Sequence, residues 1–248
     1  MLKLYFEMVS IAIAILVTSC VGVYICTEGS GHLSKETFTV QNFQKLSINV
    51  PSKIFIIQDS IPKLEIETDD NLFNFLNIEV SNEKLTIDSE KGICPRKLHI
   101  YITNPVFKEI EVNGSGDIFA QSPINTDEIN IGINGSGDVS IDSIKAQKIK
   151  IEINGSGDIK VAGSADNFLV EINGSGDVKA LKLLTRNATI ETNGSGDVYV
   201  NTTEELSVDI SGSGDVYYLG NPRSTHLSIS GSGTIKKYFP KGADEMKK

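Results

Sequence analysis

The feature that most constrains the fold is a pentapeptide, Asn-Gly-Ser-Gly-Asp, which recurs through the C-terminal half of the chain. Seven copies, five identical and two beginning with Ser, start at Asn113, Asn134, Asn154, Asn173, Asn193, Ser211 and Ser230. Successive copies start 21, 20, 19, 20, 18 and 19 residues apart. This near-constant spacing indicates stacked repeats, in which each unit buries its apolar side against its neighbours.

The residues around each motif alternate between apolar and polar, as in Ile149–Ile153 before one copy and Ile159–Val161 after it. This period of two predicts strands with one buried face, whose β-branched side chains form ladders from unit to unit. The predicted fold is all-β, a right-handed parallel β-solenoid of about 20 residues per coil, preceded by an N-terminal signal or anchor segment. The handedness follows from the strong preference of parallel crossovers.

Two glycines in each motif let the chain bend sharply between strands, because glycine accepts positive φ at little steric cost. The structural turn residues predicted in this way are Gly114, Gly116, Gly135, Gly137, Gly155, Gly157, Gly174, Gly176, Gly194, Gly196, Gly212, Gly214, Gly231 and Gly233.

The chain divides into segments by composition and by the strength of the repeat. The predicted segments are a signal peptide at 1–19 (or a membrane anchor to 26), a flexible linker at 20–35, irregular β coils or a cap at 36–104, the regular solenoid at 105–240 and a disordered tail at 241–248. Within the irregular region, 71–76 is expected to form a short plug over an open end of the stack.

The N-terminus resembles a bacterial lipoprotein signal. An apolar run, Met8–Val17, is followed by Thr18, Ser19 and Cys20, so the resemblance implies cleavage before Cys20 and lipidation of its sulfur. The apolar character continues to Cys26, which leaves an uncleaved membrane anchor as an alternative, together with a plain secretory signal. All three predict a location outside the cytoplasm, in the cell envelope.

The remaining cysteines, Cys26 and Cys94, allow a disulfide, although two residues alone favour unpaired thiols. The three histidines, His32, His99 and His226, are not spaced as a metal cage with them. A net charge of −9 argues against nucleic acid as a partner. No cofactor is predicted.

The last residue of the motif forms a column of carboxylates. If these side chains repel their neighbours by about 1 kcal/mol in water, something must offset the repulsion. Hydrogen bonds within the turn are the favoured explanation, and a row of Ca²⁺ ions is the alternative. The calcium candidates are Asp117, Asp138, Asp158, Asp177, Asp197 and Asp215.

Two further outward-facing rows accompany this column. An acidic row two residues before the motif is interpreted as a solvated face or as a docking strip for a basic partner; its members are Glu111, Glu152, Glu171, Glu191 and Asp209. Past the turn, Phe119, Tyr199 and Tyr217 are interpreted as local packing, because Ser and Lys occupy this position in the other coils.

An enzyme would need a singular cluster of side chains that breaks the symmetry of the repeat. The best candidate, Arg223 and His226 with Asp215 nearby in the sequence, is weak, and no catalytic residues are predicted.

The repeated turns, together with Phe38–Val50, Leu98–Ile102 and Pro105–Glu111, resemble the bacterial family "putative auto-transporter adhesin, head GIN domain", over about residues 36–238. The resemblance implies an envelope protein that often carries a lipoprotein or secretion signal, and it brings no established site residues. We therefore expect a non-catalytic lipoprotein of the outer membrane or periplasm that serves as an adhesin or scaffold, with an unknown glycan or protein ligand. The alternatives are a carbohydrate-active β-helix lyase or hydrolase and a Ca²⁺-binding accessory protein.

Overall fold

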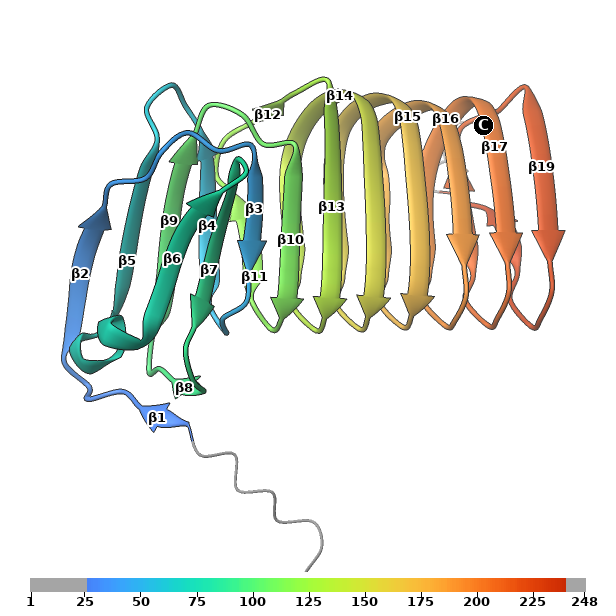
Figure 1. Cartoon of the computed structure of the whole chain (residues 1–248). Coiled ribbons are helices and arrows are strands. Elements are labelled where there is room, and N and C mark those ends of the chain that lie inside the picture. The colour runs from blue at the N-terminus through green and yellow to red at the C-terminus, as the bar shows by residue number, and fades with distance from the viewer. Residues whose placement is uncertain (1–25, 240–248) are drawn as a thin grey trace, which may run out of the picture.

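The computed structural model describes residues 26–239, which form parallel strands stacked into a β-solenoid of about 20 residues per turn (Figure 1). The predicted fold class is therefore confirmed. The predicted signal peptide, the lipidation site Cys20 and the tail 241–248 lie outside the described residues. Among residues 26–239, no helix has the length and apolar character needed to cross a membrane.

The regular part of the solenoid consists of strands that pair in parallel with their equivalents in the next coil. Their bounds are β10 Glu109–Gly114, β11 Asp117–Ala120, β12 Ile124–Asn125, β13 Glu128–Gly135, β14 Val139–Gly155, β15 Ile159–Gly174, β16 Val178–Thr192, β17 Val198–Ile210, β18 Val216–Leu219, β19 Ser224–Ile229 and β20 Ile235–Lys237. Strands β14 to β17 run unbroken from one turn, around the return, to the next turn.

The core consists of apolar columns that run along the solenoid, as the alternation predicts. In one column, which lies just before the turns, consecutive coils contribute Leu46, Ile110, Ile131, Ile151, Val170, Ile190, Val208 and Leu227. The members from Leu46 to Val208 are at most 2% exposed. Burial of one such side chain stabilises the fold by about 1.5–3 kcal/mol, so the columns hold the coils together.

The turns stack directly on one another along one edge of the solenoid (Figure 1). A Cβ atom added to Gly137 or Gly157 would lie well inside 3.0 Å of the carbonyl oxygen of the turn below. Glycine is therefore required there by the close approach of two backbones. Positive φ is a second reason at some first glycines, such as Gly114 with φ +113°.

The N-terminal region builds two further coils and a cap, and its order in space differs from its order in the chain. Its elements are β1 Thr27–Glu28, β2 Leu33–Phe38, β3 Lys45–Ile48, β4 Lys53–Gln58, β5 Lys63–Asp69, the 3-10 helix η1 Asp70–Phe75, β6 Leu76–Ser81, β7 Lys84–Ser89, β8 Ile93–Cys94 and β9 Leu98–Asn104. The coil of β3 and β4 lies between the coil of β7 and β9 and that of β10 and β11.

Strands β2, β5 and β6 pair antiparallel and form a cap, which was one of the two alternatives for the irregular region. The solenoid has two sheets, one of strands that precede the turns and one of strands that follow them. Strand β6 pairs with β7 at the end of the first sheet, and β5 and then β2 follow β9 at the end of the second, so both sheets end in antiparallel strands. The predicted plug corresponds to η1, which buries Leu72 completely. The N-terminal end of the solenoid is thus closed.

The described part of the predicted flexible linker, residues 26–35, is held against this cap, contrary to expectation. Cys26 and Cys94 form a disulfide, which also corrects the preference for unpaired thiols, and β1 pairs with β8. The buried carboxylate of Asp69 accepts the backbone N–H groups of Gly31 and Arg96 at 2.7 and 2.9 Å. These contacts could not be predicted from the sequence because the partners lie 27 to 68 residues apart. We call this arrangement of residues 26–32 against 69–71 and 93–96 the N-terminal clasp.

Candidate functional site

The aspartate column lies beside the turns and joins each coil to the next. The Oδ1 atom of Asp138 accepts the backbone N–H of Asp158 at 2.8 Å, and that of Asp158 accepts the N–H of Asp177 at 2.9 Å. The same bond links successive members from Asp117 to Asp215 and then to Thr234. A charge-assisted hydrogen bond between coils therefore offsets the repulsion between neighbouring carboxylates.

Local cations and hydroxyl groups further stabilise the charged form of some of these carboxylates. Burial raises the pKa of Asp158, but the ammonium group of Lys179, 2.6 Å away, outweighs it, and the net pKa is lowered. The hydroxyl group of Thr234, with that of Tyr217, lowers the pKa of Asp215. Among the described residues, no three His, Cys, Asp or Glu side chains are grouped closely enough to hold a metal ion.

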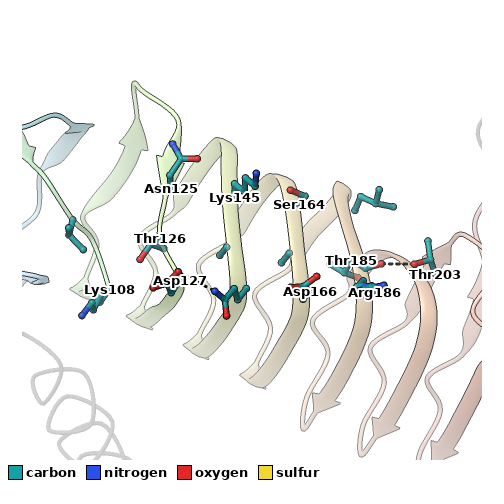
Figure 2. A pocket seen from close by; sticks show the side chains of 15 residues that line it. Lys108, Asn125, Thr126, Asp127, Lys145, Ser164, Asp166, Thr185, Arg186 and Thr203 are labelled. Carbon is teal, nitrogen blue, oxygen red and sulfur yellow. Dashed lines mark hydrogen bonds between the residues drawn. The ribbon is translucent and has the colours of Figure 1, made fainter.

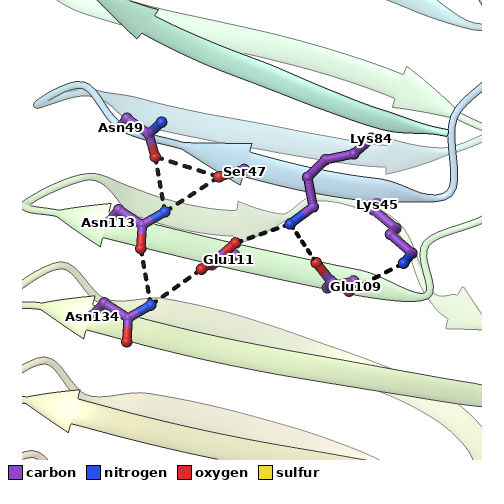
Figure 3. Close-up of polar contacts among 8 residues, drawn as sticks. All are labelled: Lys45, Ser47, Asn49, Lys84, Glu109, Glu111, Asn113 and Asn134. Atoms are coloured by element: carbon purple, nitrogen blue, oxygen red, sulfur yellow. Dashed lines mark hydrogen bonds and ion pairs between the residues drawn. The ribbon is translucent and has the colours of Figure 1, made fainter. Parts of the chain in front are cut away.

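An asparagine ladder runs parallel to this column and was not predicted as such. The side-chain amide of Asn113 donates to Asn49 at 2.8 Å, and Asn134 donates to Asn113 at 2.9 Å (Figure 3). The same bond continues through Asn154 and Asn173 to Asn193. The repeated Asn was visible in the motif, but Asn49 lies outside it and only the fold aligns it with the ladder.

The second acidic row is partly neutralised by lysines from neighbouring strands. Lys84 contacts Glu109 at 2.7 Å and Glu111 at 3.2 Å (Figure 3). Lys150 bridges Glu152 and Glu171 at 2.7 and 3.1 Å. These pairs reduce the charge that the row would offer to a basic partner and favour a solvated face.

The aromatic side chains past the turns form two separate stacks. Phe55 lies between Tyr101 and Phe119, with ring centroids 5.2 and 5.8 Å apart, and Tyr199 stacks on Tyr217 at 4.8 Å. Phe55 and Tyr101 were missed because they lie outside the regular repeats. Since the rings cover one another's faces, the stacks fit local packing better than a flat platform for a sugar ring.

The weak catalytic candidates have separate partners. Arg223 forms an ion pair with Glu204 at 3.2 Å, and the ring of His226 lies 3.8 Å from Glu205. Asp215 is instead bonded to Thr234 and Tyr217. The fold therefore does not bring the three side chains together as an acid–base cluster.

A hollow lies on the opposite side of the coils from the turns, where each coil returns. It is an open groove of about 870 Å³ that crosses successive coils (Figure 2). Its lining includes Val106, Lys108, Asn125, Thr126, Asp127, Lys145, Ala146, Gln147, Ser164, Ala165, Asp166, Leu184, Thr185, Arg186 and Thr203. We call it the return-face groove.

The register explains why this surface is hollow. Ala146, Ala165 and Thr185 are aligned on neighbouring coils and form a floor of small side chains. One wall consists of aligned residues that precede the floor in each coil, namely Asn125, Lys145, Ser164 and Leu184. The other wall consists of the residues that follow the floor position in each coil, namely Asp127, Gln147, Asp166 and Arg186. Small floor residues between longer exposed ones leave a channel.

The polar groups of the groove are spread along its length. Lys108, Lys145 and Arg186 supply positive charge, and Asp127 and Asp166 supply negative charge. Gln147 donates to Asp127 at 3.2 Å. Such an arrangement can make many weak contacts at intervals of about 4.8 Å, the spacing of strands. The groove was not predicted from the sequence, because the returns vary in length and composition. The only sequence signal for it was the small residue that recurs in the returns, as at Ala146 and Ala165.

The comparisons with known proteins agree with the fold. No curated protein matches the chain. A crystal structure described as a "putative adhesin" from Bacteroides fragilis superposes with a TM-score of 0.80 at 27% identity, covering 85% of this chain and 99% of that one.

Two structures from Parabacteroides species share the fold. One, described as a "putative lipid binding protein" from Parabacteroides distasonis, has a TM-score of 0.72 at 23% identity and covers 87% of this chain and 100% of that one. The other, described as a "putative adhesin" from Parabacteroides merdae, has a TM-score of 0.70 at 24% identity and covers 86% and 99%.

A family model matches residues 42–222, which include both N-terminal coils and six of the seven turns. That match covers most of the chain and confirms the resemblance seen in the sequence. The chain belongs to the family described as "putative auto-transporter adhesin, head GIN domain".

Proposed function

We propose that this protein is a non-catalytic adhesin of the bacterial cell envelope, anchored through a lipid on Cys20, and that the return-face groove binds an extended polymer. Membership of the family supports an adhesin-like surface role. The lipid anchor is supported by the sequence before Cys20, and a location outside the reducing cytoplasm by the Cys26–Cys94 disulfide.

The single observation that carries the proposal is the regularity of the groove. Aligned positions on successive coils line it, so that a chain-like ligand lying along the solenoid meets a small floor residue and two exposed side chains at each coil, although the exposed side chains differ from coil to coil. Catalysis requires one distinctive cluster of acids and bases, whereas here Asp127 and Asp166 lie on different coils. A repeated binding surface is what adhesion to a polymer requires.

The experiment is a binding screen of the chain from Val21 to Lys248 against a glycan array and host-matrix proteins. A double variant, Lys145→Glu with Arg186→Glu, should weaken binding of any hit at least tenfold. The control is Lys53→Glu, because Lys53 lies on β4 and outside the groove. Loss of binding in the control but not in the double variant would refute the groove as the site. Cleavage of a bound polysaccharide would refute the non-catalytic role and favour the lyase or hydrolase.

Release of the protein from membranes tests the anchor. Cys20→Ser should move the protein from the detergent-soluble membrane fraction to the soluble fraction. Retention of the variant in the membrane would favour the uncleaved anchor instead.

A further inference from the structure

The C-terminal end of the solenoid, formed by β19 and β20, differs from every other part of the stack. All six residues of β19 are exposed. Leu227 and Ile229 pair with Val208 and Ile210 and continue their apolar columns, yet they are 49% and 47% exposed, against 2% and 0% for those partners. We call β19 and β20 the open tip.

No described element covers this end. Strand β19 pairs only with β17 and β20 only with β18, so each leaves one edge of backbone N–H and C=O groups free among the described residues. Phe239, just beyond β20, is 72% exposed. Residues 240–248 lie outside the described residues and contain no aromatic side chain.

The opposite end is protected in the usual way for an edge strand. Antiparallel strands extend both faces of the solenoid there, and β2 contains the charged residues Lys35 and Glu36. Strand β19, in contrast, contains no Lys, Arg, Asp or Glu. Strands β2 and β6 also leave one edge unpaired among the described residues, but the charged residues Lys35, Glu36 and Glu79 on them disfavour the addition of another strand and so disfavour a head-to-tail fibre.

We propose that the open tip pairs with the open tip of a second copy of this chain. A two-fold axis normal to the two sheets would place β19 antiparallel to β19 of the second copy, and β20 antiparallel to its β20. Both sheets and the apolar core would then continue from one molecule into the other. Such an interface is closed, since each copy uses the same surface. The absence of Lys, Arg, Asp and Glu from β19 suits its pairing, because a two-fold axis brings like residues together. In β20, Lys236 and Lys237 would approach their copies, but each has a partner in its own chain, Asp215 and Asn221 respectively.

The position of the N-terminus gives the pairing a consequence for adhesion. The N-terminal clasp and the open tip lie at opposite ends of the solenoid (Figure 1). Paired tips therefore hold the two N-terminal segments at the far ends of a double-length rod. If the chain is anchored as proposed above, on which this step rests, the pair joins two facing surfaces. The inferred partner is the same protein on a neighbouring cell.

The test uses the chain from Val21 to Lys248 in sedimentation velocity and small-angle X-ray scattering over a range of concentrations. We expect a monomer–dimer equilibrium whose dimer has about twice the maximum dimension of the monomer. Leu227→Glu should raise the dissociation constant at least tenfold. The matched control is Leu184→Glu, since Leu184 is also about half exposed, at 51%, but lies in the groove. Ile229→Lys is a second tip variant, and melting curves verify that each variant folds.

A chain that stays monomeric at all concentrations would overturn the proposal, as would a dimer no longer than the monomer. Dissociation by Leu184→Glu but not by Leu227→Glu would place the interface on the groove and also overturn it. Equal protection of β19 from hydrogen exchange at every concentration would also overturn it, because another part of the same chain would then cover the tip.

Beads coated with the protein through its N-terminus test the joining of facing surfaces. They should clump with the wild-type protein and not with Leu227→Glu. If the protein forms dimers in solution but the beads do not clump, the proposal that the pair joins two facing surfaces is refuted and the tip-to-tip pairing stands. Binding of a glycan or matrix protein in the groove is independent of both the dimer and the bead results.

Discussion

At the scale of single residues, the glycines of the turns show how local and long-range causes combine. The second glycine of a motif lies against the backbone of the turn below, so a methyl group has no room there. Gly132 provides a contrast, because a Cβ atom added to it would meet nothing closer than 4.0 Å. The turn glycine, which lies between two strands, and Gly132, which lies within β13, therefore face different constraints.

We therefore predict opposite effects for two alanine substitutions. Gly157→Ala should lower the free energy of unfolding by about 3 kcal/mol, because the added methyl group collides with the carbonyl oxygen of Gly137. Gly132→Ala should leave it unchanged or raise it by about 0.5 kcal/mol, since alanine loses less chain entropy on folding. Urea denaturation of both variants measures the difference. Equal stability of the two would show that the turns do not stack as described.

A second residue-scale prediction concerns pH. The pKa of Asp215 is lowered from 3.8, first by the Thr234 hydroxyl group, so its contribution to stability is present above about pH 4 and is lost as the pH falls through the lowered value. Asp215→Asn should cost about 1 kcal/mol at pH 7 and flatten the loss of stability between pH 5 and pH 2 (both rough bounds). Denaturant midpoints at several pH values provide the measurement.

The control for this experiment is Asp142→Asn. Asp142 pairs with Lys160 on the surface and its side chain is 75% exposed, so the pair is screened by water and salt. Its substitution should change the pH profile less than Asp215→Asn does. A larger change in the control would mean that the contacts between coils are not what stabilises the charged aspartate.

At the scale of elements, the strands of the repeats could be predicted from alternation, but their partners in the N-terminal half could not. Residues 64–68 alternate as clearly as 46–50, yet the first segment pairs antiparallel in the cap and the second pairs parallel in a coil. Alternation of apolar and polar residues shows which face of a strand is buried, but it does not show whether the neighbouring strand runs parallel or antiparallel. The N-terminal clasp is the largest element that the sequence concealed.

The clasp gives a prediction at this scale. Cys94→Ser should lower the free energy of unfolding by about 2–4 kcal/mol, because the disulfide closes a long loop whose cysteines are separated by 68 positions in the sequence. Hydrogen exchange should increase first in β1 and β8, while β14 to β16 stay protected. Asp69→Ala should loosen the same strands, since it leaves the N–H groups of Gly31 and Arg96 without their acceptor. Loosening of the turns instead would contradict the role of the clasp.

At the scale of the whole molecule, stability comes from contacts between adjacent coils. The aspartate carboxylates accept backbone N–H groups of the next coil, so an ion is not needed to offset the repulsion between them. We predict that excess chelator leaves the melting temperature unchanged. A rise in the melting temperature on adding Ca²⁺, reversed by the chelator, would contradict this and restore the calcium hypothesis.

The sequence by itself determined the solenoid, its coil length and the positions of its turns, because each repeat carries the same local signals of alternation and glycine. Its family could also be recognised from these motifs. Only the tertiary structure decided the order of the N-terminal coils, the disulfide, the groove and the open tip. These features depend on contacts between residues that are distant in the sequence, such as the hydrogen bond between Asp69 and Gly31 and the alignment of Ala146 with Ala165. No local sequence pattern encodes such contacts.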